Sequence, residues 1–177
     1  PHLISTVLPR QILNTALLML GNGLGVLVIG VSSAWLVTTC RFPGRPIFEW
    51  ALLLPLAVPA YIVAFVYTDI FEFAGVFQTS LRSLFGWESA QDYLFPNIRS
   101  LGGAIFVMSS VLYPYVYLLA RATFQEQSVC MLEASRMLGR GPWRTFVTVA
   151  LPLARPAIGV GLALALMETL ADFGTVE

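Results

Sequence analysis

The segment from Leu132 to Pro156 reads L-E-A-S-R-M-L-G-R-G-P-W-R-T-F-V-T-V-A-L-P-L-A-R-P and separates two apolar stretches of the chain. It contains four of the ten basic residues, Arg136, Arg140, Arg144 and Arg155. Arginines concentrate in the cytoplasmic loops of membrane proteins, so this segment is predicted to face the cytoplasm. Helix formers precede Gly139, and Gly141 and Pro142 interrupt the pattern before it resumes. Two short helices joined at a bend are therefore predicted.

The composition indicates that lipid surrounds most of the chain. Hydrophobic residues make up 57% of the 177 residues and charged residues only 11%, whereas roughly a quarter of a soluble domain is charged. The mean hydropathy is +0.77. These few charges could not cover the surface of a soluble protein. The predicted fold class is therefore an all-α, polytopic membrane helix bundle. The net charge of zero gives no indication of nucleic-acid binding.

Membrane spans are predicted from the apolar stretches, at about 11–38, 47–70, 101–120 and 156–174. Pro55 and Pro59 lie four residues apart in the second span and predict a kinked helix there. The fourth stretch is free of charge only as far as Met167, so Glu168 is expected within or near the membrane.

Two connecting segments complete the prediction of a single transmembrane domain over residues 1–177. Residues 71–100 form the external segment, where apolar residues at helical spacing predict a short amphipathic helix. Residues 122–155 form the cytoplasmic loop. Seven arginines, at positions 41, 45, 121, 136, 140, 144 and 155, fall on the cytoplasmic side of this topology, and three, at 10, 82 and 99, fall outside. This asymmetry sets the orientation.

The cytoplasmic segment resembles a known motif. The segment is similar to the EAA loop of ABC importer permeases in three places: Glu133-Ala134-Ser135, then Gly139 four residues after Ser135, and then Leu151-Pro152. Ser135 stands where a second alanine is usual, and serine is small enough to keep close helix packing. Three further stretches resemble ferric-iron permeases, so the resemblance covers most of the chain: F-P-G-R from Phe42, Y-P-Y-V-Y-L-L-A-R from Tyr113 and E-T-L-A-D-F-G-T-V from Glu168.

The resemblance implies part of the transmembrane core of a type I (MetI-like) ABC importer in a bacterial inner membrane. The EAA loop of that family docks on a cytoplasmic ATPase, and the residues expected to couple the two subunits are Glu133, Ala134, Ser135, Gly139, Leu151 and Pro152. The implied partners are an ATPase dimer, a substrate-binding protein, and a second permease half or homologous subunit. No cofactor is expected on this chain, because it lacks a phosphate-binding G-x-x-x-x-G-K-[ST] loop; ATP would be used by the partner.

Three carboxylates are candidates for the translocation path: Glu168, Asp172 and Asp69. Glu168 and Asp172 lie four residues apart and therefore share a helix face. A carboxylate at membrane depth is expected to face the bundle interior or water, although a structural hydrogen bond or an outer-surface position would also accommodate it. The resemblance to ferric-iron permeases implies ferric iron as the substrate, and carboxylate oxygens suit such a hard cation, with no metal site firmly assigned.

The glycines of G-N-G-L-G, Gly21 to Gly25, have a separate predicted role. Their spacing is not that of a dinucleotide-binding loop, and they lie within an apolar span. Gly21 and Gly25 are therefore predicted to let a neighbouring helix approach closely, with Asn22 hydrogen-bonded inside the bundle.

Other functions stay open at this point. Permeases for thiamine, phosphonate, sulfate or polyamines share the EAA-type loop, and a secondary transporter or channel would share the composition without needing that loop. A membrane enzyme is disfavoured, because His2 is the single histidine and Cys40 and Cys130 lack metal-binding spacing.

Overall fold

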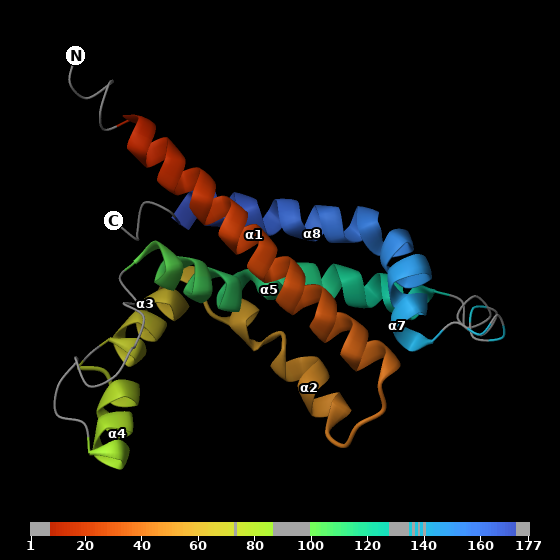
Figure 1. The fold of residues 1–177 in the computed structure, drawn as a ribbon, viewed down its shortest axis with the longest axis horizontal. Helices are drawn as coiled ribbons and strands as arrows, with labels where there is room; N and C mark the ends of the chain where they lie inside the picture. The colour runs from red at the N-terminus through yellow and green to blue at the C-terminus, as the bar shows by residue number, and fades with distance from the viewer. Residues whose placement is uncertain are drawn as a thin grey trace.

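The computed structural model describes residues 8–72, 74–86, 100–127, 135, 137, 139 and 141–172, and the elements found among them are helices. Three long helices lie side by side: α1 (Leu8–Thr39), α5 (Leu101–Glu126) and α8 (Leu151–Asp172) (Figure 1). Within the described residues, three helical stretches are long and apolar enough to cross a membrane, Gln11–Thr39, Leu101–Glu126 and Pro142–Ala171. The predicted all-α membrane bundle is confirmed.

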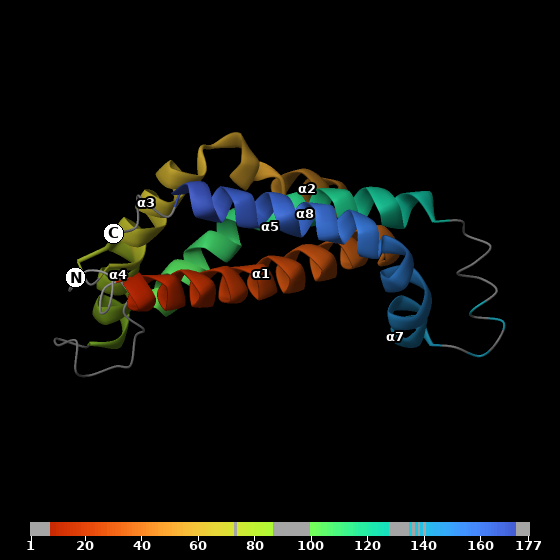
Figure 2. The ribbon, with the colours of Figure 1, turned by 90° about the horizontal axis from the view of Figure 1, so that it is seen from above.

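Helix α5 is the centre of the bundle, because both α1 and α8 pack along it (Figures 1 and 2). Glycines bring the backbones together. A Cβ on Gly30 of α1 would lie 3.0 Å from the carbonyl oxygen of Tyr113, and one on Gly161 of α8 would lie 2.9 Å from Cα of Val116. Leucines and valines of α1 and α8 that point away from α5 are exposed, as expected for a lipid-facing surface.

The predicted kinked helix over 47–70 is broken in the structure. It consists of α2 (Arg45–Ala51), the short 3₁₀ helix η2 (Leu54–Ala57) and α3 (Ala60–Phe71), and Val58 between the last two has an extended backbone with φ −121° and ψ 137°. Each proline lacks an N–H group, and its ring excludes a helical position for the carbonyl four residues earlier. Pro55 and Pro59 are close enough together that the helix ends and restarts rather than bends.

The fourth membrane span was predicted to begin at about Pro156, but the helix that forms it, α8, begins at Leu151. It is preceded without a gap by α7 (Pro142–Thr145) and the π-helical segment η3 (Phe146–Ala150), and Pro156 lies inside α8. Proline is tolerated there because neighbouring groups in a membrane bundle can satisfy the freed carbonyl. Because α8 itself starts at Leu151, five residues before Pro156, Glu168 lies nearer the far end of the span than a start at Pro156 would place it. Near η3 the chain turns, so that α7 points away from the axis of α8 (Figures 1 and 2).

The two ends of the bundle carry different elements. The N-terminal part of α1, the C-terminal part of α8 and the short helices α3 and α4 (Val76–Phe85) lie at one end, whereas α7 and the last turns of α5 lie at the other (Figure 1). Helix α4 is the short helix predicted within 71–100. It exposes Val76, Leu84 and Phe85, and it buries Gln78, which donates a 2.7 Å hydrogen bond to the carbonyl of Phe71.

Candidate functional site at the α7 end of the bundle

The described residues among those predicted to couple to an ATPase lie at or next to the α7 end of the bundle, which we define as Ser135, Met137, Gly139, α7, η3 and the last turns of α5. Ser135 is buried, and its hydroxyl lies 2.9 Å from that of Thr145, the last residue of α7. This hydroxyl pair holds the loop at Ser135 against α7. Leu151 and Pro152 are half-buried at the start of α8. Glu133 and Ala134 lie outside the described residues.

Gly139 occupies a turn with φ +74°, a conformation that L-residues rarely adopt. A Cβ at this position would meet nothing within 4 Å. The requirement for glycine therefore comes from the backbone angle and not from lack of space. This turn leads from the segment around Ser135 back into α7.

An aromatic cluster connects the α7 end to two of the long helices. Phe146 of η3 is buried, and its ring centroid lies 4.8 Å from Trp35 of α1, 6.3 Å from Phe124 of α5 and 5.5 Å from Trp143 of α7. Trp35 and Phe124 also pack edge to face at 5.5 Å. Such aromatic pairs each contribute about 0.5–1.5 kcal/mol beyond the area that they bury. A displacement of η3 therefore acts on α1 and α5 together.

The π-helical geometry of η3 has a hydrogen-bonding consequence. A π-helix shifts the backbone bonds from the i→i−4 pattern, which leaves carbonyls near its end in need of another donor. Gln127, at the C-cap of α5, donates from Nε2 to the carbonyl of Ala150 at 2.9 Å. The end of α5 is thereby tied to the junction between η3 and α8. Gln127 was not singled out from the sequence, and no local pattern identifies its partner.

An ion-pair network that was not predicted from the sequence holds α2 against α5. Arg121 of α5 lies 2.9 Å from one carboxylate oxygen of Glu49, and Arg45 lies 3.2 Å from the other. Tyr117 donates to the Glu49 carbonyl at 3.3 Å. Arg45 and Glu49 are four residues apart on a helix, and this spacing favours an ion pair between them. The pair with Arg121 spans 72 positions and depends on the tertiary fold.

A buried polar network joins the three long helices nearer the other end. Asn22 of α1 donates to the hydroxyl of Thr169 at 2.6 Å and accepts from Ser109 of α5 at 3.0 Å. Gly21 and Gly25 lie on either side of this point, facing Ile105 and Ser109 respectively, and a Cβ on either glycine would overlap those side chains. The close approach of α1 and α5 and the Asn22 hydrogen bonds were both predicted from the G-N-G-L-G stretch.

The three candidate path carboxylates lie on different elements. Glu168 is half-buried on α8, Asp69 is exposed on α3, and Asp172 is the last residue of α8. Among the residues that the structure describes, no group of three or more His, Cys, Asp or Glu side chains could hold a metal ion. The carboxylates therefore give no assembled metal site in the described part of the chain.

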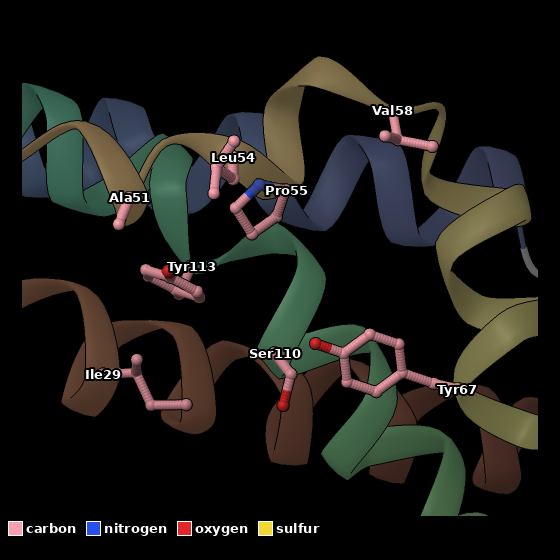
Figure 3. Close-up of a pocket in the computed structure, with 8 residues that line it drawn as sticks. All are labelled: Ile29, Ala51, Leu54, Pro55, Val58, Tyr67, Ser110 and Tyr113. Carbon is pink, nitrogen blue, oxygen red and sulfur yellow. The ribbon is translucent and has the colours of Figure 1, made fainter. Parts of the chain in front are cut away.

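A hollow of about 520 Å³ opens beside α5 at the break between α2 and α3 (Figure 3). Five apolar residues line it together with three residues that carry hydroxyl groups. The lining consists of Ile29, Ala51, Leu54, Pro55, Val58, Tyr67, Ser110 and Tyr113. Tyr113 belongs to the Y-P-Y-V-Y-L-L-A-R stretch, and no role was predicted for Tyr67 or Ser110.

The sequence of this chain matches the family model described as the binding-protein-dependent transport system inner membrane component, over residues 26–177. The chain belongs to this family. The assignment confirms the predicted type I ABC importer permease and its bacterial inner-membrane location, and the three membrane-length helices agree with both.

Curated relatives of this permease carry different substrate names. The molybdenum transport system permease protein ModB of Escherichia coli K12 is 32% identical over 148 residues, covering 84% of this chain and 61% of that protein. The Fe(3+)-transport system permease protein FbpB 2 of Haemophilus influenzae is 29% identical over 164 residues, covering 93% and 28%. The sulfate transport system permease protein CysT of E. coli K12 is 29% identical over 149 residues, covering 84% and 50%. The chain thus spans between 28% and 61% of the length of these three transport permeases.

Proposed function

We propose that this permease forms part of the membrane pathway of an ATP-driven importer that works by alternating access. A cytoplasmic ATPase dimer would dock on the α7 end, and a substrate-binding protein would dock at the opposite end, near α3 and α4. The observation that carries the proposal is the chain of contacts from Ser135 through Thr145 and Phe146 to Trp35 and Phe124. Through it, a push on the loop reaches two membrane helices.

The exposed surface at the α7 end supports docking of a protein there. Met137 is 90% exposed and Trp143 is 72% exposed. With the loop in the cytoplasm, these large apolar side chains face water rather than lipid, and covering them with a partner removes apolar surface from water. Closure of the ATPase dimer would then move α7 and η3, and the aromatic cluster would tilt α1 and α5 between inward-open and outward-open arrangements.

Ferric iron is the proposed substrate. Ferric iron is favoured by the three stretches that resemble ferric-iron permeases, which begin at Phe42, Tyr113 and Glu168. In addition, the Fe(3+)-transport permease of Haemophilus influenzae aligns with 93% of the chain. A tetrahedral oxyanion is the second candidate, because the E. coli molybdenum permease has the higher identity and the sulfate permease is also related.

Transport by the reconstituted complex tests this function. The complete permease, its ATPase and its binding protein in proteoliposomes should accumulate radioactive iron supplied as ferric ion on the binding protein. Accumulation should require ATP and should stop when the nucleotide-binding lysine of the ATPase is replaced. ATP-dependent accumulation of molybdate or sulfate instead of iron would reject the ferric assignment and keep the importer. Accumulation that is indifferent to ATP would contradict the importer itself.

Replacement of Glu168 by glutamine should lower ferric uptake while leaving assembly and basal ATP hydrolysis unchanged. Glutamine keeps the size and hydrogen-bonding capacity of glutamate but removes the charge that would attract a cation in the path. Iron uptake and ATP hydrolysis should be measured on the same preparations, with Glu126→Gln as the matched variant at an exposed glutamate outside the candidate path. Uptake by the Glu168→Gln variant equal to that of the parent would assign Glu168 to packing of the bundle.

A further inference from the structure

Helix α2 is attached to the bundle mainly by polar groups. None of its seven residues is buried, and Ile47 and Trp50 are 72% and 76% exposed. Glu49 connects α2 to α5 in two ways: its carboxylate lies 2.9 Å from Nη2 of Arg121, and its backbone carbonyl accepts a 3.3 Å hydrogen bond from Tyr117. A partly exposed ion pair adds little net stability, so such an attachment can open and re-form at low cost.

The segment formed by α2 and η2 lies between two bends of the backbone. Gly44 precedes α2 with φ +85°, and Val58 follows η2 with an extended backbone. Residues at the ends of such elements are the positions at which hinge movements occur in proteins. Ala51, Leu54 and Pro55 of the segment form one wall of the hollow beside α5, and residues of α1 and α5 face them (Figure 3). A rotation of the segment about its two ends would therefore change the width of the hollow.

The last turns of α5 connect this attachment to η3. Arg121, Phe124 and Gln127 follow one another at three-residue intervals on α5 and its C-cap. Phe124 contacts Phe146 with ring centroids 6.3 Å apart, and Gln127 donates to the carbonyl of Ala150. Backbone hydrogen bonds keep two turns of a helix rigid, so a displacement of η3 that moves Phe124 and Gln127 also moves Arg121.

The ion pair between α2 and α5 can open without stranding a charge. Arg45 lies on α2 itself and bonds the other carboxylate oxygen of Glu49 at 3.2 Å, so Glu49 keeps a partner wherever α2 moves. The Arg121 side chain is 24% exposed and can be solvated by water. Its Nε is buried and has no hydrogen-bond partner among the residues that the structure describes, which costs free energy in this arrangement. Opening the pair therefore avoids the penalty of a buried, unpaired charge and lets Nε find an acceptor.

Resting on the proposed importer function, we propose that the ion pair between Glu49 and Arg121 is a latch that holds the α2–η2 segment against α5 and opens when the ATPase closes. Movement of α7 and η3 shifts the last turns of α5, and Arg121 separates from Glu49. The released segment turns about Gly44 and Val58 and widens the hollow beside α5. Arg121 is thus a positioning residue that sets the place of α2 and does not touch the substrate.

Distances between spin labels on α2 and α1 test the latch without transport. Native cysteines are replaced by serine, and the labels are attached to Trp50→Cys on α2 and Leu20→Cys on α1, which replace exposed side chains. The complete permease with its ATPase in nanodiscs should give one distance without nucleotide and a shifted distance after trapping with ATP and vanadate. Arg121→Gln should raise the nucleotide-free population at the shifted distance about 2- to 30-fold, the usual range for a residue that couples two elements.

Arg45→Gln is the matched control, because it removes a guanidinium group from the same carboxylate but leaves the bond between α2 and α5. It should keep the parental distance, and Arg121→Lys, which keeps the charge, should restore most of it. Glu49→Gln breaks the latch from the other side and should give the shifted distance even if Arg121→Gln does not fold. A parental distance in both Arg121→Gln and Glu49→Gln, or an equal shift in Arg45→Gln, overturns the latch. A parent whose distance does not change on trapping also overturns it.

Transport measurements separate the latch from the importer. In proteoliposomes, Arg121→Gln should still hydrolyse ATP, but the iron or molybdate transported per ATP, whichever the parent accumulates, should fall about 2- to 30-fold, because α2 no longer follows the ATPase. A parental ratio in Arg121→Gln overturns the coupling role of the latch and leaves the importer standing. A parent without ATP-driven uptake rejects the importer, and the coupling role with it, while the spin-label distances still decide whether the latch exists.

Discussion

Replacing Gly139 with valine should lower ATP-driven uptake and weaken association with the ATPase, while the permease still folds and inserts into the membrane. The φ of +74° costs an L-residue about 1–2 kcal/mol, and a β-branched residue tolerates it least. The turn would relax to a negative φ and redirect the segment that holds Ser135 against Thr145. Uptake should fall about 5- to 30-fold if the relaxed turn shifts the docking equilibrium by that strain energy, because about 1.4 kcal/mol corresponds to a tenfold change.

Two glycines provide matched controls for this variant. Gly141 lies in the same loop with φ −64°, and a Cβ there meets nothing within 4 Å, so Gly141→Val should transport normally. Gly86 has φ +71° and equally open surroundings, but it caps α4 at the other end of the bundle, so Gly86→Val carries the same strain away from the ATPase and should leave ATPase co-purification at the parental level. Initial uptake rates and ATPase co-purification should be measured for all three. Normal uptake by Gly139→Val with normal association would refute the role of this turn.

Truncation of Phe146 to alanine should uncouple ATP hydrolysis from transport. Removing a buried phenylalanine costs about 3 kcal/mol or more, and here it removes the ring that touches Trp35, Phe124 and Trp143 at once. The ATPase would still dock on the α7 end, so hydrolysis should continue. Uptake per ATP hydrolysed should fall strongly, because η3 no longer moves α1 and α5 with it.

Val147 supplies the control, since it is the next residue of η3 and is exposed. Val147→Ala should keep the parental ratio of substrate transported to ATP hydrolysed. The ratio is measured in one proteoliposome preparation per variant, with the folded fraction checked by size-exclusion chromatography. A parental ratio in Phe146→Ala would show that force reaches the helices by another route.

The long helices could be read from the sequence because lipid imposes simple requirements. An uninterrupted apolar stretch predicts a spanning helix, and the helices observed over Gln11–Thr39 and Leu101–Glu126 agree with the two stretches predicted there. Proline gave less reliable information. Pro55 starts the short 3₁₀ helix η2 and Pro59 precedes α3, whereas Pro114 and Pro156 lie within long helices, because the effect of proline depends on which neighbouring groups satisfy the freed carbonyl.

The candidate site was predictable where a local rule applied. Gly139 follows from the positive φ that a turn of this kind needs, and Gly25 follows from the small residues at helix contacts. The contacts of Phe146 with Trp35, of Gln127 with Ala150 and of Arg121 with Glu49 join residues far apart in the chain. No periodicity or spacing encodes such pairs, since they depend on how the helices pack.

Cross-linking from the α7 end tests directly whether the ATPase docks there. Cys40 and Cys130 are replaced by serine, Met137 is changed to cysteine, and a photoreactive maleimide is attached before illumination with the ATPase present. Val76→Cys at the opposite end is the control, because Val76 is 75% exposed and Met137 is 90% exposed. An adduct with the ATPase is expected from position 137 and none from position 76. No adduct from position 137 in an assembled, transporting complex, or equal adducts from both positions, would contradict it.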